Sequence, residues 1–245
     1  MNIILANSCN ELEKLLAKRV TKLFIVTAAL LPFFIKVIVN NLFITDWMAL
    51  PLENINFSVL DLFISILLPL FIFIAATYLF TGEGEQGTLF QVRPISRIEL
   101  FLTKNFAICL IVGIQLLTVW LSIMVSSAIL GQSFQLSMIL TSLGAFLVSW
   151  VPLIVLTALA ILLAQIVNSS IIAIASMIFL YLVMVFLPYV LPTIMYLLPT
   201  SYIDWYMQWH GNVSFLWIVQ TVTYLCSSFA LFFSTGYYIF NKKEA

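Results

Sequence analysis

The run NFAICLIVGIQLLTVWLSIMVSSAIL, residues Asn105 to Leu130, has no charged side chain, and the sequence continues without Asp, Glu, Lys, Arg or His as far as Ile203. Loops of any size in water would carry charge, so a lipid solvent accounts for the pattern. The whole chain of 245 residues agrees, because 63% of them are hydrophobic, 8% are charged and the mean hydropathy is +1.15. Soluble proteins carry about 25% charged residues. The sequence therefore predicts an integral membrane protein.

Six stretches are apolar and long enough to cross a bilayer, for which a helix needs roughly 20 residues. They cover residues 23–43, 59–80, 105–130, 138–164, 169–191 and 213–240. We therefore predict an all-α membrane protein with six transmembrane helices, which form a single domain over residues 23–245.

Residues 1–22 precede the first span, and charges interrupt their apolar residues, so we expect no cleavable signal peptide. Ser8 and Glu11 fit an S-x-x-E capping box, and Leu12 and Leu15 follow at helical spacing. We predict an amphipathic interfacial helix on the inner membrane surface. The alternative is an ordinary extension of the first span.

Lys and Arg residues gather on one side of the predicted bundle. They are Lys14, Lys18, Arg19, Lys22, Arg93, Arg97, Lys104, Lys242 and Lys243. They precede the first span, separate the second from the third and follow the sixth, and short cytosolic loops are the ones enriched in such residues. Both termini and the loop over residues 81–104 are therefore expected in the cytosol. On the opposite side the polar positions are acidic or neutral, Asp61 and Asp204 among them.

The loop over residues 81–104 is the main polar insertion of the chain. Residues 85–91 can form a short helix, and Pro94 breaks it. Ser96 and Glu99 then form a second capping box, which starts a helix that runs into the third span. We predict that the loop projects a compact cytosolic element between spans two and three.

Little in the chain suggests catalysis. Residues 82–87 match G-x-G-x-x-G, but a membrane span precedes them where a dinucleotide fingerprint needs a strand. Cys9, Cys109 and Cys226 lie far apart and His210 is the single histidine, so no metal-ligand spacing can be drawn. An intramembrane enzyme would also need paired catalytic groups that the spans lack. We expect no catalytic residue, no metal site and no cofactor bound by this chain.

Lys36 is the only basic residue inside a predicted span, and Asp61 lies near the outer start of the second span. The two could form an ion pair in the outer half of the membrane if these spans are antiparallel neighbours. The alternative is that Lys36 extends toward the membrane surface, as long amphipathic side chains do.

Residues 191–212 are too polar and too often interrupted by proline to form a span. They are rich in aromatic residues, namely Tyr196, Tyr202, Trp205, Tyr206 and Trp209. Such rings favour the headgroup level of a membrane. We predict a re-entrant or interfacial segment of one or two short helices on the outer face, which covers the space between the spans.

The loop over residues 81–104 also contains a specific series of short motifs. It contains in order Glu83 and Glu85, Gly87-Thr88-Leu89, Arg93-Pro94-Ile95-Ser96-Arg97, Glu99-Leu100 and Lys104. This succession resembles the acidic, GTL, RPISR and K pattern of the type-two ABC exporter permeases. The helix before the first span, the six spans and the aromatic segment before the last span agree with that family.

The resemblance implies that the chain is a permease and that ATP and Mg are bound by a separate ABC ATPase subunit, present in two copies. The loop would be the coupling helix that docks on the ATPase. The docking residues would be Glu83, Glu85, Gly87, Thr88, Arg93, Pro94, Ser96 and Arg97. The resemblance further implies a second permease subunit, identical or homologous, in a bacterial plasma membrane, with no nucleic-acid partner.

In its short length, the chain is most similar to the permeases of lantibiotic immunity and peptide export. That likeness implies a hydrophobic or amphipathic cargo, such as an antimicrobial peptide, and a role in immunity or antibiotic resistance. Aromatic residues including Phe179, Tyr181, Phe186 and Tyr189 would suit such a cargo, but they would equally suit lipid.

Two other functions stay open on the sequence. An ion-coupled secondary transporter would need carboxylates within the membrane, and only Asp61 qualifies. A non-transporting membrane scaffold could use the same polar loop to recruit a partner.

Overall fold

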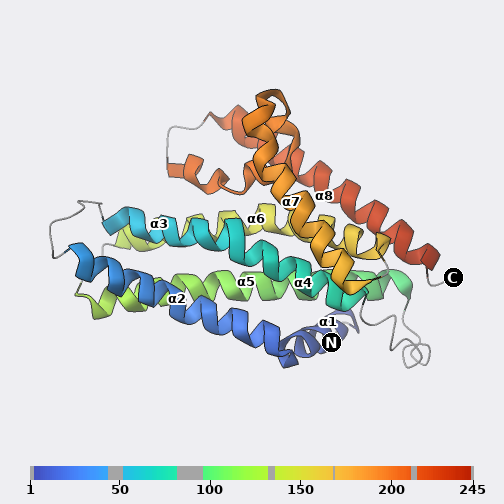
Figure 1. The fold of residues 1–245 in the computed structure, drawn as a ribbon, viewed down its shortest axis with the longest axis horizontal. Helices are drawn as coiled ribbons and strands as arrows, with labels where there is room; N and C mark the ends of the chain where they lie inside the picture. Colours follow the sequence, from blue (N-terminus) through green and yellow to red (C-terminus); the bar gives the residue numbers. More distant parts are fainter. Residues whose placement is uncertain are drawn as a thin grey trace.

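The computed structural model describes residues 3–43, 52–81, 96–131, 136–167, 169–210 and 214–243, and these ranges are helical with no strand (Figure 1). The α-helices are α1 (Ile3–Ala17), α2 (Arg19–Phe43), α3 (Leu52–Leu62), α4 (Leu68–Phe80), α5 (Arg97–Ile129), α6 (Leu136–Ile166), α7 (Ser170–Val190) and α8 (Phe215–Lys243). A π-helix, η1 (Phe63–Leu67), joins α3 to α4, and three short 3-10 helices, η3 (Pro192–Leu197), η4 (Pro199–Tyr202) and η5 (Trp205–His210), lie between α7 and α8.

Six helical stretches within these ranges are long and apolar enough to cross a membrane. They are residues 19–39, 55–80, 97–129, 136–166, 170–190 and 215–242. The predicted all-α class with six transmembrane helices is therefore confirmed. The second span is built from α3, η1 and α4 in succession.

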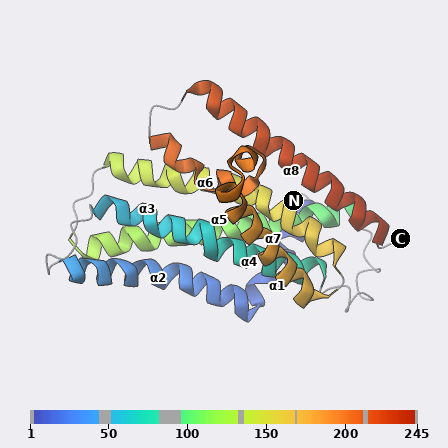
Figure 2. The same ribbon diagram turned by 45° about the horizontal axis from the view of Figure 1, so that its top comes forward.

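Two helices form the centre of the bundle. α5 packs against α1, α2 and α6, and α6 packs against α4, α5 and α8. Figures 1 and 2 show α2, α3–α4, α5 and α6 running side by side, with α7 and α8 crossing them obliquely. In the apolar window of α6 61% of the residues are buried, compared with 22% in α7 and 11% in α8. The window of α2 is 17% buried, so the apolar faces of α2, α7 and α8 are the surfaces most available to lipid or to another subunit.

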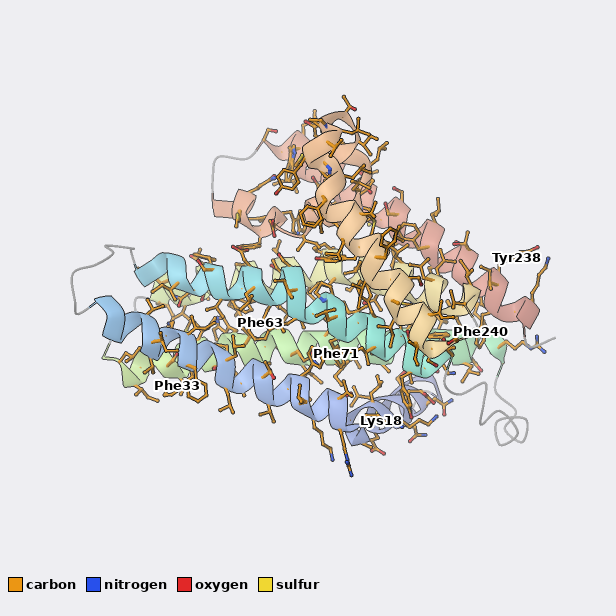
Figure 3. The ribbon with its side chains drawn as sticks, viewed as in Figure 1. Lys18, Phe33, Phe63, Phe71, Tyr238 and Phe240 are labelled. Atoms are coloured by element: carbon orange, nitrogen blue, oxygen red, sulfur yellow. The ribbon has the colours of Figure 1, made fainter. Side chains whose placement is uncertain are left out.

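Figure 3 shows Phe63 and Phe71 between the helices of the central layer, and both side chains are buried. The Phe71 ring lies 5.4 Å from that of Phe24 on α2. Interlocking aromatic rings of this kind add to the packing that associates helices in a bilayer.

The helix before the first span is present, but its start differs from the prediction. α1 begins at Ile3, so Ser8 lies inside the helix rather than at its N-cap, and the capping box expected there is wrong. Ser8 and Glu11 are buried, and Lys14 Nζ lies 2.7 Å from a Glu11 carboxylate oxygen. α1 packs on α5, and the Lys18 ammonium after it lies 4.1 Å from the centre of the Tyr78 ring. The ion pair lies within α1, whereas the packing on α5 and the Lys18 contact with Tyr78 of α4 hold the helix against the bundle.

α5 and α6 approach each other closely at Gly113. A Cβ atom added there would lie 2.9 Å from Cζ2 of Trp150 on α6. The Trp150 ring cannot easily give way, because its indole N–H donates to the Cys109 carbonyl at 3.0 Å. Only glycine therefore fits at position 113 without displacing the ring.

We predict that Gly113→Ala lowers the stability of the chain by about 1 kcal/mol, the lower end of the cost of overpacking a core. Gly144→Ala on α6 is the matched control, because a Cβ there meets no atom within 4 Å. That change should raise stability by about 0.5–1 kcal/mol, the helix preference of alanine over glycine. Thermal unfolding of both variants in nanodiscs measures the difference, and melting temperatures that shift in the same direction would contradict the assignment.

Candidate functional site

The loop residues expected to dock a partner lie mostly outside the described residues. Those are Glu83, Glu85, Gly87, Thr88, Arg93 and Pro94. The structure does describe the two helix ends that flank the loop, and these ends include Ser96 and Arg97. The geometry at these two ends shows how the loop is attached to the bundle.

The start of α5 has the capping box that the sequence predicts. The Ser96 hydroxyl accepts from the Glu99 N–H at 3.4 Å, and the Ser96 N–H donates to a Glu99 carboxylate oxygen at 3.1 Å. Two of the donors left free at a helix N-terminus are thereby satisfied. The loop therefore enters α5 at a fixed residue.

Side chains at the same two ends reach carbonyls of three other helices. Lys104 of α5 donates to the Leu79 carbonyl of α4 at 2.8 Å, and Arg97 donates to the Asn241 carbonyl of α8 at 2.9 Å. The Thr81 hydroxyl, directly after α4, donates to the Ala164 carbonyl of α6 at 3.1 Å. Cations are favourable at helix C-termini, where carbonyls lack helical partners.

Aromatic packing fills the space between these bonds. The buried Phe101 ring of α5 lies 5.7 Å from Phe80, 5.0 Å from Phe233 and 5.5 Å from Phe240. Figure 3 marks Phe240 near the end of α4, where the Phe80 and Phe240 rings are 6.0 Å apart. We call Thr81, Ser96, Arg97, Phe101 and Lys104, with their partners, the anchor block. It joins α4, α5, α6 and α8 at the base of the loop.

The expected pair of Lys36 and Asp61 is not formed, because each residue has another partner. The Lys36 ammonium donates to the Ser127 hydroxyl and, at 3.3 Å, to the Ile123 carbonyl of α5. Lys36 is buried, so the alternative in which it extends to the surface is also wrong. Asp61 accepts instead from the Tyr206 hydroxyl of η5. Lys36 thus joins α2 to α5, and Asp61 joins the second span to the outer-face segment.

The outer-face segment contains three 3-10 helices, where the sequence predicted one or two short helices. Its aromatic residues differ in exposure: Trp205 and Tyr206 are buried, whereas Tyr196 is 71% exposed and Trp209 is 50% exposed. The Tyr202 hydroxyl donates to the Tyr196 carbonyl at 3.0 Å. Only part of the segment therefore presents its rings outward, and the rest packs on the bundle.

Prolines in the spans explain how this segment and α7 are held. Proline lacks an N–H, so the carbonyl four residues earlier loses its helical partner. For Pro69 that carbonyl belongs to Ser65, and the Tyr181 hydroxyl of α7 donates to it at 2.6 Å. The π-helix η1 lies at the same place, as helices commonly widen where the regular bonding is interrupted.

The same arrangement recurs at two other prolines. Pro152 of α6 frees the carbonyl of Val148, which accepts from the indole N–H of Trp205 at 2.8 Å. Pro188 of α7 frees the carbonyl of Met184, which accepts from the Thr200 hydroxyl at 3.1 Å. In each case a side chain replaces the backbone donor that the proline removed.

A cavity of about 520 Å³ lies beside the bond between Tyr181 and Ser65. Its lining comes from η1, α4, α7 and the outer-face segment, and includes Phe73, Tyr181, Phe186 and Asp204. Phe179 and Tyr189, the other two aromatic residues considered for a cargo, do not line it and are 70% and 83% exposed. The sequence missed the cavity, because it arises where α7 crosses α4.

Two carboxyl groups, those of Asp204 and Asp61, lie near the outer end of the cavity. Burial raises the pKa of the Asp204 carboxyl above its usual range, and the nearby Asp61 carboxylate adds to this effect. Burial raises the pKa of Tyr206 as well, and its hydrogen bond to Asp61 keeps the phenol protonated. The site therefore combines apolar walls with acidic groups at the outer face.

The proline-freed carbonyls give a direct prediction. Tyr181→Phe removes only the hydroxyl that bonds to Ser65, and we expect it to cost about 1 kcal/mol of stability. In a Pro69→Ala background the backbone can supply its own donor, so the same change should cost clearly less. Tyr189→Phe, on the exposed end of α7, is the control and should cost nothing measurable. Thermal unfolding of the unmodified chain, the two single variants Tyr181→Phe and Pro69→Ala, and the double variant measures both costs. An equal cost of Tyr181→Phe in both backgrounds would refute the assignment.

A model of the ABC-2 family transporter proteins matches residues 9–185, which is more than half of the chain and extends from α1 to α7. Comparison with curated proteins gives no match. The match confirms the resemblance drawn from the loop, and this family implies an ABC ATPase as partner. The chain thus belongs to the ABC-2 family of transporter proteins and is a multi-pass membrane permease subunit of an ABC transporter.

Proposed function

We propose that this permease couples ATP hydrolysis by a separate ATPase subunit to the export of a hydrophobic or amphipathic molecule, an antimicrobial peptide being one such cargo. The anchor block is the observation that carries the proposal. A loop that only recruits a partner needs no firm connection to the spans, whereas a coupling loop has to move them. Here the two ends of the loop are bonded to α4, α6 and α8 as well as to α5.

In the proposed complex two ATPase subunits bind ATP and Mg, and two permease subunits, identical or homologous, form the membrane part. ATP-driven closure of the ATPases would push the loop of each permease. A change in conformation requires that the ATP-bound ATPases favour one state of the spans over another. The anchor block would carry the displacement into four helices together, as a rigid-body movement.

The loop residues divide into two roles under this proposal. Glu83, Glu85 and Arg93 would meet opposite charges on the ATPase, which orients the two surfaces. Gly87 would allow close approach of the backbones. Arg97 instead positions the loop, because its guanidinium bonds to α8. The bacterial plasma membrane, with both termini in the cytosol, is the proposed location.

Ion-coupled transport is less well supported. Asp61 is the carboxylate that such a mechanism would use, and it is bonded to Tyr206 where the outer-face segment packs on the second span. The hydrogen bonds at the base of the loop also have no role in a mechanism driven by an ion gradient. A scaffold would bind the ATPase without transport, so export has to be measured separately.

We expect Glu85→Lys or Arg93→Glu to abolish co-purification of an ATPase activity with the tagged permease from native membranes. Each change places a like charge against the partner, which costs more than losing a contact. Glu13→Lys on the exposed side of α1 is the matched control and should retain the ATPase. The measurement is magnesium-dependent ATP hydrolysis in the eluate, with mass spectrometry of the retained protein. Equal ATPase recovery with the loop variants and the control would exclude docking on this loop.

A further inference from the structure

The cavity between α4 and α7 has the size of a ligand site. Its volume of about 520 Å³ falls within the roughly 300–1,000 Å³ that small-molecule pockets occupy. Ile66 of η1, Leu182 of α7 and Phe186 of α7 form part of its lining and are 50%, 46% and 61% exposed. All three belong to candidate spans, so the exposed rim lies at the depth of the membrane. A molecule dissolved in the bilayer can therefore reach the cavity sideways.

Two of the polar groups in the lining already have partners. The Tyr181 hydroxyl donates to the Ser65 carbonyl, and the Thr200 hydroxyl donates to the Met184 carbonyl. The charged group of the lining is the carboxylate of Asp204, which lies between η4 and η5. A ligand thus meets apolar walls along α4 and α7 and an acidic group at the outer end.

The protein supplies little positive charge on this side. Residues 44–58, 131–137 and 191–214, which connect the spans at the outer end, contain no Lys or Arg. Lys36, the basic residue within a span, is bonded to Ser127 and Ile123 of α5. Asp61 adds a second carboxylate near Asp204, and the two raise the local negative potential. A cationic group is therefore the complementary partner, whereas a head group whose only charge is a carboxylate or a phosphate would be repelled.

We propose that this cavity binds an amphiphile with one ammonium group, whose apolar tail packs on Phe73 and Phe186 and whose ammonium group lies at Asp204. The interpretation of this cavity as the cargo site rests on the proposed export function. The binding of the amphiphile does not depend on that function. Tail burial supplies most of the affinity, and the charge selects cationic over neutral or anionic heads.

Binding of tritiated dodecylamine to the full chain in phosphatidylcholine nanodiscs tests the proposal, measured by scintillation proximity with unlabelled dodecylamine as competitor. We expect saturable binding, with competition at least tenfold weaker by dodecanol and absent with dodecanoate. Asp204→Asn should weaken binding about tenfold, whereas Glu13→Gln, on the exposed side of α1, should leave it unchanged.

A second pair of variants tests the apolar wall and guards against misfolding. Phe186→Ala should weaken binding severalfold, whereas Phe179→Ala should have no effect, because both residues are exposed on α7 but only Phe186 lines the cavity. Unchanged affinity in Asp204→Asn, unchanged affinity in Phe186→Ala, or equal competition by dodecanoate would each overturn the proposal.

Two sources could supply such an ammonium group, and the lipid composition separates them. If phosphatidylethanolamine in the nanodiscs displaces the probe, the occupant is a lipid with an amine headgroup. If the probe stays bound, the occupant is another cationic amphiphile, such as a peptide. The assay contains no ATPase and no ATP. Saturable binding without ATP-driven export in proteoliposomes would therefore preserve the site and reject the export function.

Discussion

Hydrocarbon cannot replace a hydrogen-bond donor that proline removes from a helix. Side chains therefore have to supply the donor, and these bonds join the spans to each other and to the outer-face segment in the outer half of the molecule. The carbonyls of Ser65, Val148 and Met184 each lack their helical partner because a proline follows four residues later. Their donors are the side chains of Tyr181, Trp205 and Thr200. Two of these three belong to the outer-face segment, so its position on α6 and α7 follows from the need to satisfy carbonyls in lipid. The bond from Tyr181 also joins α7 to the second span beside the cavity.

The two ends of the bundle are built differently. At the base of the loop, cations and a hydroxyl reach the C-terminal carbonyls of neighbouring helices around the buried ring of Phe101, and four helices meet there. At the outer end, a hydroxyl bond from Tyr181 joins α7 to Ser65 of η1 beside a cavity with an exposed apolar rim. A displacement of the loop would therefore move the anchor block as one body, and the outer cavity is the place where the helices can change their spacing.

Much of the fold could be predicted from the sequence, because a bilayer enforces long uncharged helices whose limits charged and polar residues mark. The capping box at Ser96 was predictable because it is local: it depends on two residues three positions apart in the sequence. Contacts between distant residues were not. Lys36 and Asp61 have suitable charges, but α5 and η5 lie closer to them than they do to each other. The acceptors at Ser65, Val148 and Met184 are implied by the positions of Pro69, Pro152 and Pro188, yet only the packing of the helices reveals which side chains fill them.

Under the proposed coupling, ATP-driven movement of the anchor block as one body would change the spacing of the second span and α7 across the outer cavity. This change in spacing can be tested by pulsed electron–electron resonance on the complex with its ATPase, with spin labels at Ile66→Cys and Leu182→Cys across the cavity. Cys9, Cys109 and Cys226 are replaced by serine, and labelled chains are diluted with unlabelled ones to exclude distances between copies. A second label pair, Ile98→Cys and Tyr238→Cys, reports on α5 and α8 at the anchor block. The account predicts that ATP with vanadate shifts the first distance and leaves the second unchanged. A constant distance across the cavity, or a change confined to the α5–α8 pair, would contradict it.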